Sequence, residues 1–209
     1  MPKRQPIIRK VSDYYSEKIL TYGPTPQGVD WNSAASQQLR FEQLMKIIPD
    51  RKSRFSILDY GCGYGSLAEF LGENYAAFSY TGFDISDAMI TEAKKKQRSK
   101  KNLWTTDLKT IAPHDYAVAS GVINVKLNFT QKEWENYVIS VLHQLDDMSK
   151  KGFSFNALTK YSDTPKMKEY LYYADPEFLF GYCKKKFSKY VALLHDYPLY
   201  EFTILVKKF

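Results

Sequence analysis

The segment that most constrains the fold is residues 57–65, which read ILDYGCGYG. The apolar run at 55–58 predicts a buried strand, and apolar residues at helical spacing after residue 66 predict a helix. Between them lie an acid, Asp59, and three alternating glycines. Glycines let the chain turn sharply and leave no Cβ between the backbone and a ligand. This unit predicts an α/β fold with a nucleotide site at the carboxyl ends of its strands.

The spacing of the glycines argues against a pyrophosphate ligand. A dinucleotide loop has the pattern G-x-G-x-x-G and places a pyrophosphate on the helix N-terminus. Here the third glycine, Gly65, comes one residue early. The carboxylate of Asp59 would repel a pyrophosphate but suits a ligand with an ammonium group. The pattern therefore disfavours a nicotinamide-dependent dehydrogenase, although such an enzyme would also have an α/β fold.

Two further segments each predict a strand that ends in an acid. In residues 79–86 (SYTGFDIS) the predicted strand ends at Asp84, and in residues 102–108 (NLWTTDL) it ends at Asp107. Asp84 lies 84 − 61 = 23 residues beyond Gly61. A carboxylate about 20 residues beyond the first glycine is expected to bind the vicinal hydroxyls of a ribose. More than one class of enzyme uses this spacing, so it supports the fold more than the ligand.

Residues 59–65 resemble motif I, D-x-G-x-G-x-G, of the class I S-adenosylmethionine-dependent methyltransferases. The resemblance covers roughly residues 53–208. It implies an α/β, Rossmann-like, seven-stranded and mostly parallel sheet with helices on both faces and a C-terminal antiparallel β-hairpin. The pattern agrees, with further strands predicted at 115–121, 151–156, 190–195 and 201–206, and helices at 86–96, 131–149 and 176–187. At 209 residues, we expect a single domain with its cofactor-binding core at 53–209.

The resemblance also implies roles for individual residues. S-adenosylmethionine, which leaves as S-adenosylhomocysteine, carries an amino-acid tail and a sulfonium but no phosphate. Asp59 would reach its amino group, directly or through water. The other residues implied to bind the cofactor lie in the glycine loop and after the second, third and fourth strands: Gly61, Cys62, Gly63, Asp84, Ile85, Asp107, Leu108 and Ser120. Among them, Asp84 would bind the ribose, and Asp107 would accept the adenine amino group with Leu108 near the base.

Residues 1–50 are expected to form a helical lid that caps the acceptor site. A short helix at 12–22 would bring Tyr14, Tyr15 and Tyr22 to the cleft. Aromatic faces can stabilise a sulfonium, although these tyrosines could equally pack. In the following helix, 33–48, Arg40 could pair with the cofactor's carboxylate or lie on the surface.

The acceptor is narrowed by what is missing near the strand ends. Residues 120–124 (SGVIN) lack the Asp/Asn-Pro-Pro-aromatic clamp of nucleobase amino methyltransferases. Ser120 and Asn156 do not supply the acids that hold magnesium in catechol-type enzymes, and the paired-glutamate loop of arginine methyltransferases is absent. We therefore expect metal-independent transfer to an oxygen or nitrogen of a small molecule. Tyr15, Asn124 and Asn156 are the candidate acceptor residues, and His195 is the candidate base or a histidine satisfied in the hairpin.

Charge and composition leave two alternatives open. The net charge is +7, and much of it lies in residues 94–101, a predicted solvated turn away from the methyl donor. A nucleic-acid partner is therefore not favoured, but an RNA or protein methyltransferase, or a non-catalytic cofactor-binding regulatory module, remains open. The sequence has no apolar run of 18 residues, no signal-peptide pattern and no metal-ligand spacing of His or Cys. We expect a cytoplasmic protein with both cysteines, Cys62 and Cys183, reduced.

Overall fold

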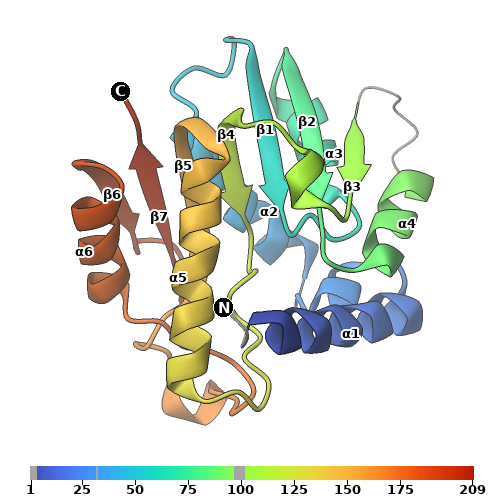
Figure 1. Ribbon diagram of the computed structural model, residues 1–209, viewed down its shortest axis with the longest axis vertical. Helices are drawn as coiled ribbons and strands as arrows, with labels where there is room; N and C mark the ends of the chain where they lie inside the picture. Colours follow the sequence, from blue (N-terminus) through green and yellow to red (C-terminus); the bar gives the residue numbers. More distant parts are fainter. Residues whose placement is uncertain (1–3, 32, 97–101) are drawn as a thin grey trace.

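The computed structural model describes residues 4–31, 33–96 and 102–209. In this part of the chain, seven strands form one sheet in the order β3-β2-β1-β4-β5-β7-β6 (Figure 1). The first five run parallel, and the last two are antiparallel to their neighbours. The α/β fold with a C-terminal hairpin is thus confirmed. The strands are β1 (Phe55–Tyr60), β2 (Phe78–Phe83), β3 (Leu103–Thr105), β4 (His114–Ala119), β5 (Ser149–Leu158), β6 (Tyr190–Leu194) and β7 (Glu201–Lys207).

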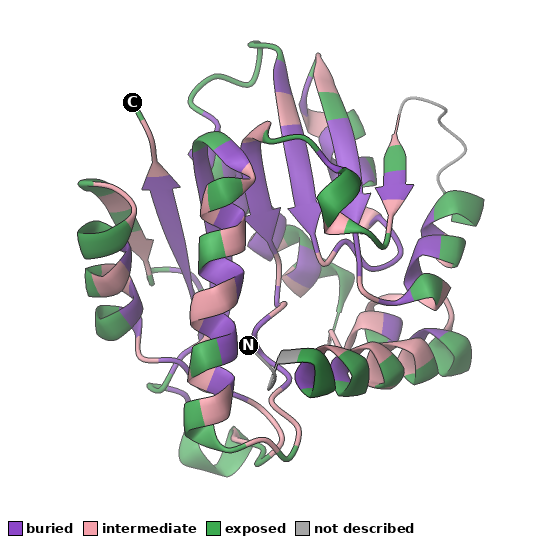
Figure 2. Ribbon diagram, in the orientation of Figure 1, coloured by how far each residue is buried: buried purple, intermediate pink, exposed green. Residues whose placement is uncertain are grey.

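Helices cover both faces of the sheet, and the strands between them are largely buried (Figure 2). Side chains alternate between the two faces, so that Leu58 packs on one side and Ile57 on the other. The Leu58 face packs against α5 (Gln131–Asp147) and α6 (Pro176–Lys186). The opposite face packs against α2 (Ala34–Leu44), α3 (Ser66–Asn74) and α4 (Asp87–Lys96).

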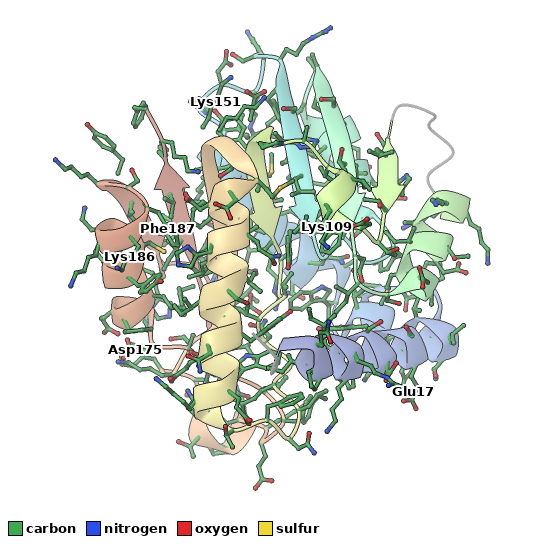
Figure 3. All side chains as sticks on the ribbon, viewed as in Figure 1. Glu17, Lys109, Lys151, Asp175, Lys186 and Phe187 are labelled. Carbon is green, nitrogen blue, oxygen red and sulfur yellow. The ribbon has the colours of Figure 1, made fainter. Side chains whose placement is uncertain are left out.

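Local sequence signals account for where several helices begin. Thr130 and Glu133 form a capping box at the start of α5. At α6, the side chain of Asp175 accepts hydrogen bonds from the N–H groups of Glu177 and Phe178. Figure 3 labels Asp175 at one end of α6 and Lys186 at the other, where basic side chains are favourable.

Several elements differ in their bounds from the sequence-based expectation, among them the first helix and the third strand. The first helix, α1 (Arg4–Tyr22), begins eight residues before the expected 12–22, because Ile7 and Val11 extend the buried stripe that includes Ile19. The third strand is shorter than the expected 102–108, because β3 is an edge strand that pairs only with β2. In the basic run, Lys94–Lys96 close α4, whereas residues 97–101 lie outside the described part of the chain.

The chain from α1 to the short turn at 26–29 lies across the carboxyl ends of the parallel strands (Figure 1). Ser12 Oγ donates to the carbonyl of Ile85 at 3.0 Å, and Ser16 Oγ lies 2.7 Å from Ser86 Oγ. These contacts tie α1 to the chain that follows β2. The short turn η1 (Pro26–Val29) is tied to α1 in turn, because Asp30 accepts from Tyr14 and Lys18. No helix in the described residues is both long and apolar enough to cross a membrane.

A substitution at Gly82 on β2 would show how tightly this end of the sheet is packed. An added Cβ would lie 2.5 Å from the ring of Trp104 and 2.9 Å from Cys62 Sγ. We expect Gly82→Ala to lower the free energy of unfolding by about 2 kcal/mol in urea titrations. Gly72, inside α3, has open space around it, so Gly72→Ala should raise stability by about 0.5–1 kcal/mol. Equal effects at the two sites would show that Trp104 can move aside.

Candidate active site

A cavity opens at the carboxyl ends of β1, β2 and β4, beneath α1, η1 and α2. Its empty volume is about 750 Å³, including the solvent at its mouth. The fold therefore places the cavity where open α/β sheets bind ligands. It is lined by Val11, Tyr15, Val29, Trp31, Gln37, Phe41, Asp59, Tyr60, Gly61, Cys62, Gly63, Ser66, Phe83, Asp84, Ile85, Met89, Ser120, Gly121, Val122 and Tyr137.

The glycine loop between β1 and α3 forms the floor of the cavity. Gly61 and Gly63 have φ angles of 79° and 53°, which residues with a Cβ rarely adopt. In this conformation the N–H groups of Gly61 and Cys62 both donate to the carbonyl of Phe83, at 2.7 and 3.0 Å. The N–H of Gly63 donates to Asp84 Oδ2 at 2.9 Å. The loop after β1 is therefore fastened to the end of β2.

Asp59 stands at the end of β1 and presents a buried carboxyl group to the cavity. Its side chain is 2% exposed, and Oδ2 accepts a hydrogen bond from Tyr80 Oη at 2.7 Å. None of the described residues donates to the second oxygen, Oδ1. Burial raises the pKa of Asp59 to about 7, with a smaller rise from Asp84 and an opposing effect of the Tyr80 hydroxyl. A cation placed beside Oδ1 would stabilise the carboxylate.

Asp84 follows β2 and holds the loops on both sides of it. Oδ2 accepts from the N–H of Gly63 and Oδ1 from the N–H of Ser86, both at 2.9 Å. Burial raises the pKa of Asp84 to about 6, and these backbone hydrogen bonds oppose the rise. A carboxylate offers about four lone-pair positions, so each oxygen of Asp84 can still accept a hydroxyl of a ligand.

The loop after β4 closes another side of the cavity. Gly121 has a φ of 70°, and its N–H donates to Asn156 Oδ1 at 2.7 Å. Asn124 Oδ1 accepts from the N–H of Leu158, so both asparagines connect this loop to β5. Ser120 lines the cavity, and its buried Oγ has no hydrogen-bond partner among the described residues.

A buried ion pair lies behind this loop. Arg40 on α2 and Glu201 on β7 are 6% and 1% exposed, and Nε of Arg40 donates to both carboxylate oxygens at 2.9 and 2.8 Å. Glu201 also accepts from Asn156 Nδ2 at 3.1 Å. The guanidinium lies 3.9 Å from the centroid of the Trp31 ring, which fills the space beside Gly121. Arg40 thus supports the cavity wall from outside.

The three tyrosines expected at the cleft have different positions. Tyr15 lines the cavity, and burial raises the pKa of its hydroxyl far above the usual range. Tyr14 is next to it, with the two rings edge to face at 5.2 Å, and donates to Asp30 at 2.8 Å. Tyr22 is 49% exposed at the end of α1, and Lys18 Nζ lies over its ring.

Of the residues that the sequence predicts for the site, eight line the cavity: Asp59, Gly61, Cys62, Gly63, Asp84, Ile85, Ser120 and Tyr15. The other eight do not line it: Asp107, Leu108, Tyr14, Tyr22, Arg40, Asn124, Asn156 and His195. Polar partners elsewhere explain the positions of Arg40 and both asparagines. Asp107 is exposed and accepts from the N–H of Lys109, so its carboxylate caps its own turn.

His195 is exposed at the end of β6, with its ring near those of Tyr161 and Phe202. Because β6 runs in the same direction as β1, His195 lies at the same edge of the sheet as the cavity. The strands β5 and β7 separate β6 from β4 in the sheet. His195 therefore lies at this edge of the sheet but does not reach the cavity.

Sequence reasoning missed most of the wall contributed by residues before β1. Gln37 and Phe41, one helical turn apart on α2, line the cavity, and Gln37 also binds the hydroxyls of Ser66 and Tyr64. Their i, i+4 spacing was a usable signal. Trp31 carried no such signal, because its place in the wall depends on Arg40 and on Gly121. Within the described residues, no three His, Cys, Asp or Glu side chains gather as a metal site.

The buried carboxyl of Asp59 should make the ligand-free protein less stable at high pH. Its folded pKa of about 7 exceeds the ordinary value of 3.8, so the folded state holds the proton more tightly. Stability therefore falls as the pH rises from about 4 through about 7. We expect Asp59→Asn to raise the free energy of unfolding by about 1–3 kcal/mol at pH 8 and to leave it nearly unchanged at pH 4. A gain of the same size at both values would contradict this.

The buried ion pair makes a second prediction. Arg40→Met would leave the carboxylate of Glu201 buried with only Asn156 as a partner, at an expected cost of about 3–5 kcal/mol in urea unfolding. The matched control is Lys18→Met, which breaks the partly exposed pair with Asp30 and should cost less than about 1 kcal/mol. If both variants lose equally little, the Arg40 pair does not support the wall.

Comparisons with known proteins agree with this geometry. Residues 57–148 match a methyltransferase domain family. A putative methyltransferase of Mycobacterium tuberculosis is 47% identical over 155 residues, which are 74% of this chain and 93% of the relative. Trans-aconitate 2-methyltransferase of Delftia acidovorans is 34% identical over 73 residues, 32% of this chain and 27% of that enzyme.

Two solved structures have the same fold at low sequence identity. Magnesium protoporphyrin IX methyltransferase from Synechocystis, with S-adenosylmethionine bound, has a TM-score of 0.63 and 15% identity, covering 95% of this chain and 96% of that one. The N-methyltransferase NodS from Bradyrhizobium japonicum, with S-adenosylhomocysteine bound, has a TM-score of 0.63 and 12% identity, covering 94% and 97%. The fold, the glycine loop and the relative from Mycobacterium tuberculosis agree. The chain therefore belongs to the class I S-adenosylmethionine-dependent methyltransferases.

Proposed function

We propose that this chain transfers the methyl group of S-adenosylmethionine to an oxygen or nitrogen atom of a small-molecule acceptor, without a metal ion. The observation that carries the proposal is the carboxyl group of Asp59, which is buried at the cavity with one oxygen unpartnered. A buried carboxylate without a cation is unfavourable, so this position suits the ammonium group of the donor.

The residues around Asp59 fit the remainder of the same donor. Asp84 can accept the ribose hydroxyls while it holds Gly63 and Ser86. The glycine loop has no side chain at Gly61 or Gly63 to fill the floor. Two carboxyl groups at one cavity favour a ligand that carries positive charge and no phosphate. When bound, S-adenosylmethionine supplies a methyl group on a positively charged sulfur.

Arg40 remains our candidate for the carboxylate of the donor. Its Nη1 is buried without a hydrogen-bond partner in the described residues, although Nε and Nη2 are held by Glu201. The ring of Trp31 covers the guanidinium and lines the cavity, so it would have to turn for contact. Asp107 and Leu108 remain candidates for the adenine, since both follow β3 at the same edge of the sheet.

The rest of the wall supports an acceptor that is already a nucleophile. Tyr15, Trp31, Val122 and Tyr137 surround the cavity with largely apolar surface, which excludes water. The hydroxyl of Tyr15 stays protonated because of its raised pKa, so it can donate a hydrogen bond but not act as a base. No histidine or lysine is among the lining residues of the described chain. A carboxylate oxygen, or an amine that binds in its neutral form, needs no base to attack a methyl group.

Two relatives support a small acceptor by their names. One of them acts on trans-aconitate and another on magnesium protoporphyrin IX. The lid held by Ser12 and Ser16 would enclose an acceptor of limited size above the donor. Independence from metal is supported by Ser120, which follows β4, and by Asn156, which lies near the end of β5, because an ion would need acids at these positions.

The test is a calorimetric titration of the protein with S-adenosylmethionine, S-adenosylhomocysteine and NAD. We expect micromolar binding of the first two and none of NAD. Asp84→Ala should weaken binding at least tenfold, because the cavity loses both an acceptor and the anchor of its loop. Asp87→Ala, an exposed acid three residues away in the first turn of α4, should bind as the native protein does.

The acceptor is then sought by following methyl transfer to panels of small carboxylic acids and amines, with and without a metal chelator. Transfer to a member of either panel that survives the chelator supports the proposal. Binding of NAD alone would contradict the choice of donor, and loss of transfer with the chelator would contradict metal independence.

A further inference from the structure

Tyr80 is a buried tyrosine that does not line the cavity but contacts one of its carboxyl groups. It stands on β2, next to β1 in the sheet, and its side chain is 2% exposed. Its hydroxyl donates to Asp59 Oδ2 at 2.7 Å. This bond occupies Oδ2, and the second oxygen, Oδ1, has no donor among the described residues. The orientation of the carboxyl group toward the cavity therefore depends on where the Tyr80 hydroxyl is held.

The packing around Tyr80 leaves its ring little freedom. The ring of Trp104 on β3 lies 5.1 Å from it, centroid to centroid. Trp104 can approach this closely because Gly82 has no side chain, and an added Cβ would be 2.5 Å from the indole. Three neighbouring strands thus hold the hydroxyl at one point. Close packing of this kind fixes a side chain in a single rotamer.

We propose that Tyr80 is a positioning residue for the methyl donor, holding Asp59 so that Oδ1 faces the cavity as an ionised partner for the donor's ammonium group. This inference rests on the proposed function, because it assumes a donor with an amino group at Asp59. Tyr80 touches neither the donor nor the acceptor. It acts through the carboxyl group of Asp59.

The titratable groups around Asp59 show how the Tyr80 hydroxyl affects the pKa of its carboxyl group. The titratable groups that face Asp59 are Asp84 at the end of β2, the thiol of Cys62 in the glycine loop and Tyr80 itself. No lysine or arginine of the described chain contributes to its pKa. Among these groups, only the hydroxyl of Tyr80 lowers that pKa, and the burial and Asp84 raise it. Without this hydroxyl, Asp59 would be protonated over more of the neutral range.

The experiment measures the Kd of S-adenosylhomocysteine by calorimetry at pH 6.5 and pH 8.5, where its amino group stays largely protonated. The native protein should bind more tightly at the higher pH, because Asp59 is then ionised. Tyr80→Phe keeps the ring against Trp104 but removes the hydroxyl. We expect it to weaken binding about tenfold at pH 6.5 and by a smaller factor at pH 8.5, because the alkaline pH restores the charge of the carboxylate but not the hydrogen bond that orients it.

Two further variants separate positioning from a general loss of structure. Tyr116→Phe removes a hydroxyl from the same apolar cluster, away from the cavity, and should leave the native pH profile. In Asp59→Asn, which removes the group on which Tyr80 acts, adding Tyr80→Phe should change the affinity little at either pH. The single Asp59→Asn variant also shows how much of the pH dependence belongs to Asp84.

Native-like binding by Tyr80→Phe at both pH values would overturn the role of Tyr80 and leave the proposed function intact. An additional loss in the Asp59→Asn background would also overturn it, because Tyr80 would then act by another route. If the native protein binds no S-adenosylhomocysteine at either pH, the proposed function fails, and this inference fails with it.

Discussion

The structure of the site depends on hydrogen bonds that fasten the glycine loop to the end of β2. One carbonyl, that of Phe83, accepts from two successive N–H groups of the loop, and the carboxyl of Asp84 accepts from Gly63. The chain reaches these acceptors only with the positive φ angles of Gly61 and Gly63. These bonds turn the chain away at the end of β1, and Asp59 is left facing an open cavity.

A second polar network performs the equivalent task for the loop after β4. Arg40, Glu201 and Asn156 come from α2, β7 and β5, and together they hold the N–H of Gly121. Buried ion pairs contribute little net stability, but removing one partner is costly. The network therefore acts mainly by specifying position. It explains why residues far apart in the chain, from α2 and from the last strand, meet behind the same wall.

The two networks show how far the sequence could predict the site. Asp59 and Asp84 reach the cavity because Asp59 lies at the end of β1 and Asp84 directly follows β2, and the ends of such central parallel strands share one edge. Asp107 follows the same rule, but β3 is short and lies at the edge, so the acid caps a turn at the surface. Arg40 binds Glu201, and Asn156 binds Glu201 and the N–H of Gly121, which come from distant parts of the chain. The sequence pattern around a polar side chain does not show which buried group that side chain will bind.

What the sequence determined by itself is the local order of strand, glycine loop and helix, and with it the edge of the sheet that carries the site. Periodicity and glycine act within a few residues, so one segment is enough to read them. Tertiary structure alone decided which polar groups face the cavity. Tyr80 meets Asp59 across 21 residues, and Arg40 meets Glu201 across 161. Such pairs form only when packing removes both groups from water, because burial then requires each to find a partner.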